Sequence, residues 1–464
     1  MKKLTAVLFA AVLYLLCACG EIAPDVASNE TTSTADMTLS VTTKTSTPDA
    51  PTSKPAAPRK AIAPFKNYSI SMAANNILFD SINMEFRDKR VPFTEKELAK
   101  LAECISLNVG WFDGESLADL PKFFPKLRHL EIGSSYHNYG IAREFYQSIA
   151  ELGLRALTIR ADSAIEPKLF ANLLYLNITS GVNDNGKPKD LKLSQHSVLG
   201  EKYISEHTDG VLIEYLRVNY GGRVYELFVK APAIGINEDS GEEYHKVETE
   251  AWLFICKKEG QGYTCADSYG PLSRYAYYNG IRGGLVLADA NFDGLEDILV
   301  LNMVEGMESR PYFHALLQQP NGKYRLCESF GMISKPELNA EKKTVRGGYR
   351  GGAGVYDWQL YTYKDNKFVQ TKNLHRNFVE YKDVNNPKEE INRHTVEKIA
   401  PDGRRYDEKE YLSSDYSEAQ WNKMFYDDSN EWALASDKWL YLYGMNLDVI
   451  NSPVPVMVMK IIKQ

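Results

Sequence analysis

Catalytic signatures are missing from this chain. It has no His-Glu-x-x-His pair, no Gly-x-Ser-x-Gly turn and no Gly-x-x-x-x-Gly-Lys-Ser/Thr loop, the patterns that mark zinc peptidases, serine hydrolases and nucleotide-binding proteins. Its eight histidines are scattered, with no two at a spacing typical of metal ligands. The sequence therefore predicts a protein that is not an enzyme. A glycan or peptide hydrolase without a recognisable motif stays an alternative, because 61 acidic residues allow many carboxylate pairs.

Excess positive charge is missing as well. The net charge is -7 and the pI is near 5.8, so the chain lacks the basic surface by which proteins bind nucleic acids. Beyond the amino-terminal segment, no apolar run approaches the ~20 residues that a membrane-spanning helix needs. We expect neither a nucleic-acid partner nor a spanning helix in the body of the chain.

The amino terminus has the features of a secretory signal peptide. Two lysines follow Met1, and an apolar run from Leu4 to Leu16 comes next. The segment Leu16-Cys17-Ala18-Cys19 resembles the lipobox of bacterial lipoproteins. That resemblance implies removal of residues 1–18, a lipid (palmitate) on Cys19, and a place in the bacterial cell envelope on an extracytoplasmic face, periplasmic or surface. The alternative is an ordinary cleaved signal that leaves Cys19 as a free thiol.

Aromatic residues are absent from residues 21–64, where Thr, Ser, Pro and Ala dominate. Such a segment does not bury enough apolar surface to offset its ordering entropy. Residues 19–64 are therefore predicted to form a disordered tether with a reach of about 35 Å.

A short apolar pattern recurs four times within residues 65–205. Its copies centre on Leu107, Leu130, Leu157 and Leu176 and have apolar residues at i, i+3 and i+5. This region resembles a leucine-rich-repeat array, although the usual Asn after each strand is missing. The resemblance implies parallel strands on one face and helices on the other. The alternative is a small α/β layer with three or four parallel strands.

Repeat arrays of this kind usually grip another protein with the exposed side chains of their strands. Their exposed strand residues are expected to form a polar interaction surface: Ser106, Asn108, Arg128, Glu131, Arg155 and Thr158.

The rest of the chain is dense in hairpin signals. Strands Val211–Asn219 and Arg223–Lys230 flank a Gly-Gly turn, and similar patterns continue to residue 372. This spacing predicts an antiparallel β-domain over residues 206–372, propeller-like or a sandwich. Residues 373–464 are expected to extend it and to contain a long polar loop from Tyr381 to Arg405. The fold class expected for the whole is α+β multidomain: the repeat-like α/β array, then the β-domain.

Cys256 and Cys265 flank one of these turns. If Gly260 and Gln261 form a two-residue loop, the two cysteines lie directly opposite each other on paired strands. A cross-strand disulfide is then geometrically possible, and an oxidising compartment favours it. The alternative is two small buried apolar side chains.

An acidic nonapeptide, residues 289–297, lies between two apolar segments, Leu285–Ala288 and Ile298–Leu301. Oxygen-bearing side chains stand at its positions 1, 3, 5 and 9 and Gly294 at position 6, a spacing by which a loop wraps a hard cation. We expect a strand, a structural Ca²⁺ loop and a second strand. The alternative is a turn whose Asp and Asn side chains cap its own backbone.

This unit is similar to the calcium loop of FG-GAP and VCBS-type β-propeller repeats, and more so to bacterial envelope lipoproteins that carry a single such loop. The resemblance covers about residues 206 to 372 and implies these ligands: Asp289, Asn291, Asp293, the carbonyl of Leu295 and Asp297. Members of that envelope lipoprotein family serve as immunity proteins that inhibit wall-cutting effectors. We therefore expect a lipid-anchored protein that binds another envelope or secreted protein, with the immunity or inhibitor role as an alternative.

Overall fold

The structure is a computed structural model, and every residue that it describes falls within one unit, Arg59–Gln464. The described residues are 70, 73–74, 77–78, 93–109, 117, 120–133, 143–161, 165–180, 190–191, 193, 210–231, 246–259, 262–277, 284–305, 310–352, 355–381, 390–400, 402–434, 436, 438–442, 457 and 460–461.

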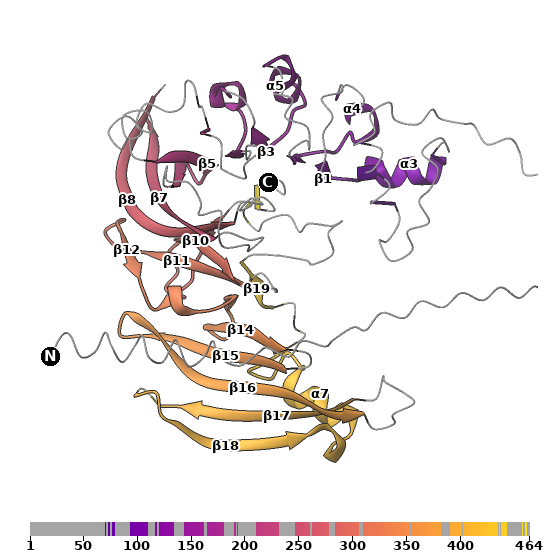
Figure 1. Cartoon of the computed structure of the whole chain (residues 1–464), viewed down its shortest axis with the longest axis vertical. Coiled ribbons are helices and arrows are strands. Elements are labelled where there is room, and N and C mark those ends of the chain that lie inside the picture. The colour runs from indigo at the N-terminus through magenta and orange to yellow at the C-terminus, as the bar shows by residue number, and fades with distance from the viewer. Residues whose placement is uncertain are drawn as a thin grey trace, which may run out of the picture. The chain divides into compact units, whose positions relative to one another are not determined.

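The first sheet has eight strands, and each pairs with the strand before it in the chain. The first four are parallel and short: β1 (Ser106–Val109), β2 (His129–Ile132), β3 (Ala156–Ala161) and β4 (Tyr175–Ser180). The last four are antiparallel: β5 (Val211–Tyr220), β6 (Arg223–Ala231), β7 (Lys246–Glu259) and β8 (Gly262–Tyr277). Figure 1 shows β7 and β8 as long, curved neighbours.

Short helices precede or separate the parallel strands: α3 (Glu95–Ala102), α4 (Leu120–Phe123), α5 (Arg143–Ala150) and the 3₁₀ turn η1 (Pro167–Phe170). A capping box begins α3: the Glu97 carboxylate accepts the Thr94 N–H at 2.6 Å, and the Thr94 hydroxyl accepts the Glu97 N–H at 3.3 Å. Apolar side chains of these helices share one core with the repeated leucines of the strands. Burial against the sheet thus stabilises helices too short to persist alone.

The expected α+β fold class, with a leucine-rich-repeat-like array as a separate part, is wrong. The structure is β-rich in several sheets, and its described residues contain only four short α-helices. The repeated leucines do pair in register: Leu107 pairs with Leu130, Leu130 with Leu157, and Leu157 with Leu176. However, β4 pairs antiparallel with β5, so the parallel strands are half of a sheet that continues through the hairpins. An apolar repeat predicts buried strands, but it does not predict which later strand completes the sheet.

The second sheet has four antiparallel strands, and strand order β12-β11-β10-β9. They are β9 (Leu285–Ala288), β10 (Asp297–Glu305), β11 (Arg310–Gln318) and β12 (Tyr324–Cys327). Alternate residues of β9 and β10 face different cores. Leu287 and Ile298 pack with apolar residues of the first sheet, whereas Val286 and Leu299 pack with residues of the third.

The third sheet has seven antiparallel strands, in the order β18-β17-β16-β15-β14-β13-β19. They are β13 (Glu337–Asn339), β14 (Thr344–Gly352), β15 (Val355–Lys364), β16 (Lys367–Tyr381), β17 (Glu390–Ile399), β18 (Arg405–Leu412) and β19 (Leu440–Tyr441). The turns η3 (Phe330–Met332) and η4 (Ser413–Asp415) and the helix α7 (Glu418–Phe425) complete the described elements of this region.

The prediction of a long polar loop from Tyr381 to Arg405 is also wrong, because β17 occupies Glu390–Ile399 within this range. Strand β17 pairs with β16 on one side and β18 on the other, and most of its side chains are half-buried. Low apolar content made the strand hard to recognise: of its described side chains, only Val396 and the ring of His394 pack on the apolar core, and most of the others are polar.

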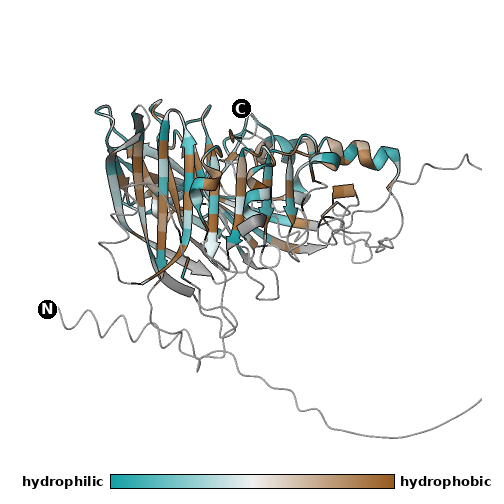
Figure 2. Ribbon diagram, turned by 90° about the horizontal axis from the view of Figure 1, so that it is seen from above, coloured by the Kyte–Doolittle hydropathy of each residue, from teal (hydrophilic) through white to brown (hydrophobic). Residues whose placement is uncertain are grey.

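In the part of the third sheet where β15, β16 and β17 lie side by side, one face is mainly apolar and the other is polar. Leu360 and Leu374 on the apolar face pack with Phe425 of α7 and with Trp432 and Trp439. Hydrophobic and hydrophilic residues alternate along many strands in Figure 2, as expected where opposite faces meet different surroundings. The apolar packing fixes the strands whose other side chains form the candidate site.

Candidate functional site

The acidic loop joins β9 to β10, which are antiparallel neighbours, with Ala288 opposite Asp297. Its side chains accept hydrogen bonds from the loop's own backbone. Asp289 accepts from the N–H groups of Asp293 and Gly294 at 3.0 and 2.9 Å, and Asp293 accepts from Leu295 at 2.8 Å. Gly294 has φ of +88°, the left-handed conformation for which glycine was expected here.

Asp297 links this loop to the next strand. Its carboxylate is fully buried and accepts the N–H groups of Ala290 at 2.9 Å and of Gln318 at 2.8 Å. Burial raises the pKa of Asp297 to about 6, against the opposing effect of these two hydrogen bonds. The loop is therefore held to β11 as well as to its own hairpin.

The residue types of the loop suit a hard cation, since Ca²⁺ prefers carboxylate and amide oxygens. A carboxylate oxygen that accepts one N–H also keeps a further lone pair. In the part of the chain that the structure describes, no group of three or more His, Cys, Asp or Glu side chains gathers as a metal site. The hydrogen bonds of Asp289, Asn291 and Asp293 also complete a self-capped turn. Calcium binding at this loop stays a prediction.

The expected interaction surface on the parallel strands needs correction. Glu131 and Thr158 are only 9% and 8% exposed, and Ser106, Asn108, Arg128 and Arg155 are half-buried. The Ser106 hydroxyl lies 2.8 Å from Nδ1 of His129, whose Nε2 lies 3.4 Å from the Thr158 hydroxyl. Ser106, His129 and Thr158 thus form a polar row across β1, β2 and β3 that is buried at His129 and Thr158. Arg128 and Arg155 lie just before β2 and β3, outside this row.

His129 was missed because nothing in the sequence distinguishes it from a surface histidine. It is 1% exposed, and burial lowers its pKa to about 4.

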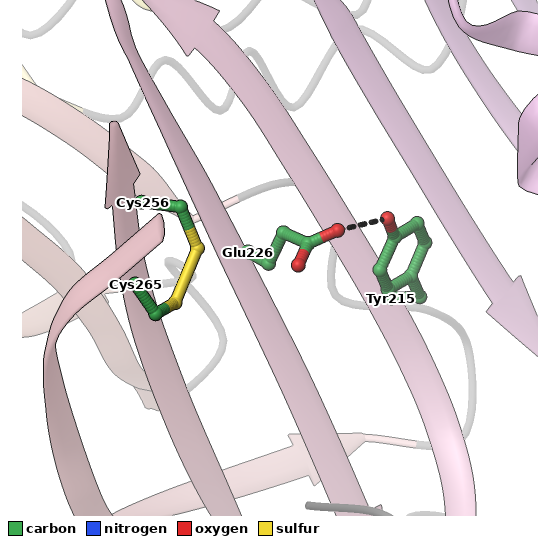
Figure 3. Close-up of a disulfide and its surroundings, with 4 residues drawn as sticks. All are labelled: Tyr215, Glu226, Cys256 and Cys265. Atoms are coloured by element: carbon green, nitrogen blue, oxygen red, sulfur yellow. Dashed lines mark hydrogen bonds between the residues drawn. A yellow bond between two sulfur atoms is a disulfide. The ribbon is translucent and has the colours of Figure 1, made fainter. Parts of the chain in front are cut away.

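Cys256 and Cys265 lie directly opposite each other on β7 and β8, and the structure joins them in a disulfide. Figure 3 shows it beside the buried pair Tyr215 and Glu226, in which the tyrosine hydroxyl donates to the carboxylate at 2.7 Å. The other two cysteines within the described residues, Cys104 and Cys327, are free thiols.

The predicted signal peptide (1–18), the lipidation site Cys19 and the tether (19–64) lie outside the described residues. Among the helices that the structure does describe, none is both long and apolar enough to cross a membrane.

The polar face of the third sheet forms a pocket of about 510 Å³, and we name it the polar pocket. Sequence reasoning did not predict it. Its lining comes from five consecutive strands, in the order β14 to β18: Tyr349, Asp357, Gln359, Asn373, His375, Thr395, Glu397, Arg405 and Glu408. Figure 1 shows these strands side by side.

Strand register explains why these residues gather. Asp357 pairs with His375, which pairs with Thr395 on the next strand. One step along, Gln359 pairs with Asn373, which pairs with Glu397. Directly paired residues point to the same face, so two rows of polar side chains cross the sheet together.

The side chains of the pocket hold one another in place. Nδ1 of His375 lies 2.7 Å from Oδ1 of Asp357. Arg405 donates through Nη1 to Glu397 at 3.0 Å. The negative charge of Asp357 raises the pKa of Tyr349.

Two buried acceptors in the pocket have few or no donors. Asp357 and Asn373 are only 7% and 6% exposed. Oδ1 of Asn373 has no hydrogen-bond partner in the described structure, and the Tyr349 hydroxyl is the group that interacts with the Asp357 carboxylate beside His375. Buried acceptors are rarely left unpaired in folded proteins, so an unpaired one calls for an explanation, of which a bound water, ion or ligand group is one.

A signal for this pocket does exist in the sequence. Polar residues stand two apart on three successive strands, as Asp357 and Gln359, Asn373 and His375, and Thr395 and Glu397. Using it requires the pairing register of β15, β16 and β17, and β17 was expected to be loop.

Comparisons with known proteins add little. No family model matches the chain, and no curated protein matches it. A solved structure described as a Xanthomonas Type IV Secretion System related protein is 18% identical. The match covers 42% of this chain and 92% of that one, with a TM-score of 0.29. We infer nothing about fold or function from a similarity at this level.

Proposed function

We propose that this protein is a lipid-anchored, extracytoplasmic binding protein of the bacterial cell envelope and that it binds its partner through the polar pocket. The observation that carries the binding role is the buried amide oxygen of Asn373, unpaired in the described structure, beside the buried Asp357 carboxylate in a cavity of about 510 Å³. Ligand pockets typically measure about 300–1,000 Å³ and contain a few fixed polar groups.

The pocket is built on strands and not on loops. Leu360 and Leu374, on the opposite face of the same strands, are buried against Phe425 of α7 and the nearby tryptophans. Sites built on such packed elements hold their side chains more closely than loop sites do. This rigidity supports recognition of a preformed partner.

The location rests on the sequence. The lipobox-like segment ending at Cys19 and the aromatic-free tether support a folded part held away from a membrane surface. The Cys256–Cys265 disulfide agrees with an oxidising, extracytoplasmic compartment.

Replacing Cys19 with Ser tests the anchor. The wild-type chain and a matched Cys17→Ser variant are expected in the membrane fraction, because the resemblance to the lipobox implies that only its last cysteine, Cys19, is lipidated. Cys19→Ser is expected in the soluble or secreted fraction, without the mass of a lipid. Membrane retention of Cys19→Ser would refute the anchor.

Filling the pocket tests the binding role without assuming any ligand chemistry. Thr395→Trp places a large ring among the polar side chains on a half-buried strand position. The matched control, Lys409→Trp, changes an exposed residue of β18 paired with Val396 of the apolar face. We expect capture of a partner from envelope extract by the wild type and by Lys409→Trp but not by Thr395→Trp. Equal capture by all three would remove the pocket from the function.

A second candidate, an immunity or inhibitor role against a wall hydrolase, is favoured by the acidic loop. The loop joins neighbouring antiparallel strands, β9 and β10, which is its position in the FG-GAP and VCBS-type repeats that it resembles, and envelope lipoproteins with an immunity role carry one such loop. Inhibition of muralytic activity by the purified chain tests this role. If the proteins captured from envelope extract include no hydrolase, and no muralytic activity is reduced, this candidate fails.

A further inference from the structure

The polar pocket is rich in hydrogen-bond acceptors. Of the lining groups that carry full charges, three are carboxylates (Asp357, Glu397 and Glu408) and one is a guanidinium (Arg405). Arg405 already donates to Glu397, and His375 already contacts Asp357. Oδ1 of Asn373 is left without a donor in the described structure, and the Tyr349 hydroxyl is the pocket group that interacts with the remaining oxygen of the Asp357 carboxylate.

The excess of carboxylates and acceptors in the lining favours some classes of ligand over others. A carboxylate or phosphate group would meet a lining with three carboxylates and one guanidinium, which is already paired with Glu397, so like-charge repulsion makes an anion unfavourable. A sugar can donate to both acceptors through neighbouring hydroxyls, but it carries no charge and leaves the excess of negative charge unbalanced. A cation with several N–H groups satisfies both acceptors and balances the excess of negative charge.

The rim of the pocket already holds one such group. Arg310 of β11 places its guanidinium 5.5 Å from the ring centroid of Tyr349. Cations are attracted to the faces of aromatic rings, so the surface around Tyr349 accommodates a guanidinium in the folded protein.

We propose that the polar pocket takes the guanidinium of an arginine, or the ammonium of a lysine, presented by a partner protein. This inference rests on the proposed binding function and names the chemistry of its site. The side chains of β18 are mostly exposed, including Arg405 and Glu408 of the pocket wall. A protein surface can therefore approach the pocket from this side.

Calorimetric titration of the mature chain with two peptides tests the chemistry. The peptides are acetyl-Gly-Gly-Arg-Gly-Gly-amide and the same peptide with citrulline, which keeps the shape of arginine and removes its charge. The arginine peptide is expected to bind saturably, and the citrulline peptide to bind at least about tenfold more weakly. Equal binding of the two peptides, or no binding of either, would overturn the inference.

A pair of matched substitutions locates the effect. Asp357→Asn keeps the size of the side chain but removes the charge, and it is expected to weaken arginine-peptide binding about tenfold or more. Asp402→Asn makes the same change in the exposed turn between β17 and β18, outside the pocket lining, and is expected to leave binding unchanged. Melting temperatures of both variants exclude misfolding. Equal affinities of both variants and the wild type would contradict the assignment to Asp357.

Competition distinguishes a protein side chain from a free small cation. Proteins captured from envelope extract are expected to be displaced by the arginine peptide and not by the citrulline peptide. A small amine that copurifies in native mass spectrometry, together with capture that the arginine peptide does not disturb, would overturn the protein source. If neither peptide binds while Thr395→Trp still abolishes capture, the cation inference fails and the binding function stands.

Discussion

Two buried histidines show how single side chains set the acid stability of this protein. The ring of His394 stacks on Trp421 at 4.5 Å, has no exposed surface, and neither of its nitrogens has a hydrogen-bond partner in the described structure. Burial, with a smaller effect of Arg376, lowers its pKa to about 3, and burial lowers the pKa of His129 to about 4. Both rings are thus neutral in the folded state at neutral pH.

Stability is expected to fall as the pH drops below about 6.5. The unfolded chain binds protons at these histidines there, while the folded chain binds them only near pH 4 and pH 3. The folded state loses up to about 1.4 kcal/mol per histidine per pH unit across this window. Thermal melting of the wild type and His394→Phe between pH 7 and pH 4 measures the effect, and the variant should lose less stability. Parallel pH profiles for both proteins would contradict the pKa of His394.

At the scale of single elements, the acidic loop carries the clearest test. Three carboxylates, those of Asp289, Asp293 and Asp297, lie within nine residues between buried strands, and their mutual repulsion is relieved by a bound cation. EDTA is expected to lower the melting temperature and Ca²⁺ to restore it. A concentration 100 times the dissociation constant contributes about 2.7 kcal/mol.

The control for this test is the double variant Asp289→Ala/Asp293→Ala, which should melt at the same temperature with and without Ca²⁺. If neither EDTA nor Ca²⁺ changes the melting temperature of the wild-type chain, the loop is the self-capped turn that its hydrogen bonds allow.

Local signals in the sequence predicted single elements well. The Thr94 capping box begins a helix, and Leu285–Ala288 forms a strand, because the signals for both elements lie in neighbouring residues. The pairing of β4 with β5 and the strand β17 were not predicted. Both depend on partners distant in sequence or on polar pairs across strands, for which apolar periodicity carries no information. The polar pocket was missed for the same reason.

At the scale of the whole molecule, the continuous first sheet predicts that the two parts expected from sequence do not fold alone. A chain of residues 206–464 would expose the edge of β5 that pairs with β4, including the buried Leu216 and Val218. Unpaired apolar edges promote aggregation.

We therefore expect residues 206–464, expressed alone, to aggregate or to lack a cooperative melting transition, as measured by light scattering and circular dichroism. The matched control keeps the whole folded region, from residue 59, and removes only the segment before it. A soluble 206–464 fragment with a cooperative transition would contradict this expectation and support a separate amino-terminal part.

The order of strands also has a consequence for synthesis. In the first sheet every strand pairs with its predecessor, so each can add to the growing edge as it leaves the ribosome or the translocation channel. The third sheet differs, because β13 pairs with β19, about a hundred residues later. The edge of β13 thus stays unpaired until Tyr441 has been synthesised. A chain stalled or truncated before residue 440 would carry a finished first sheet and an open edge on the sheet that bears the polar pocket.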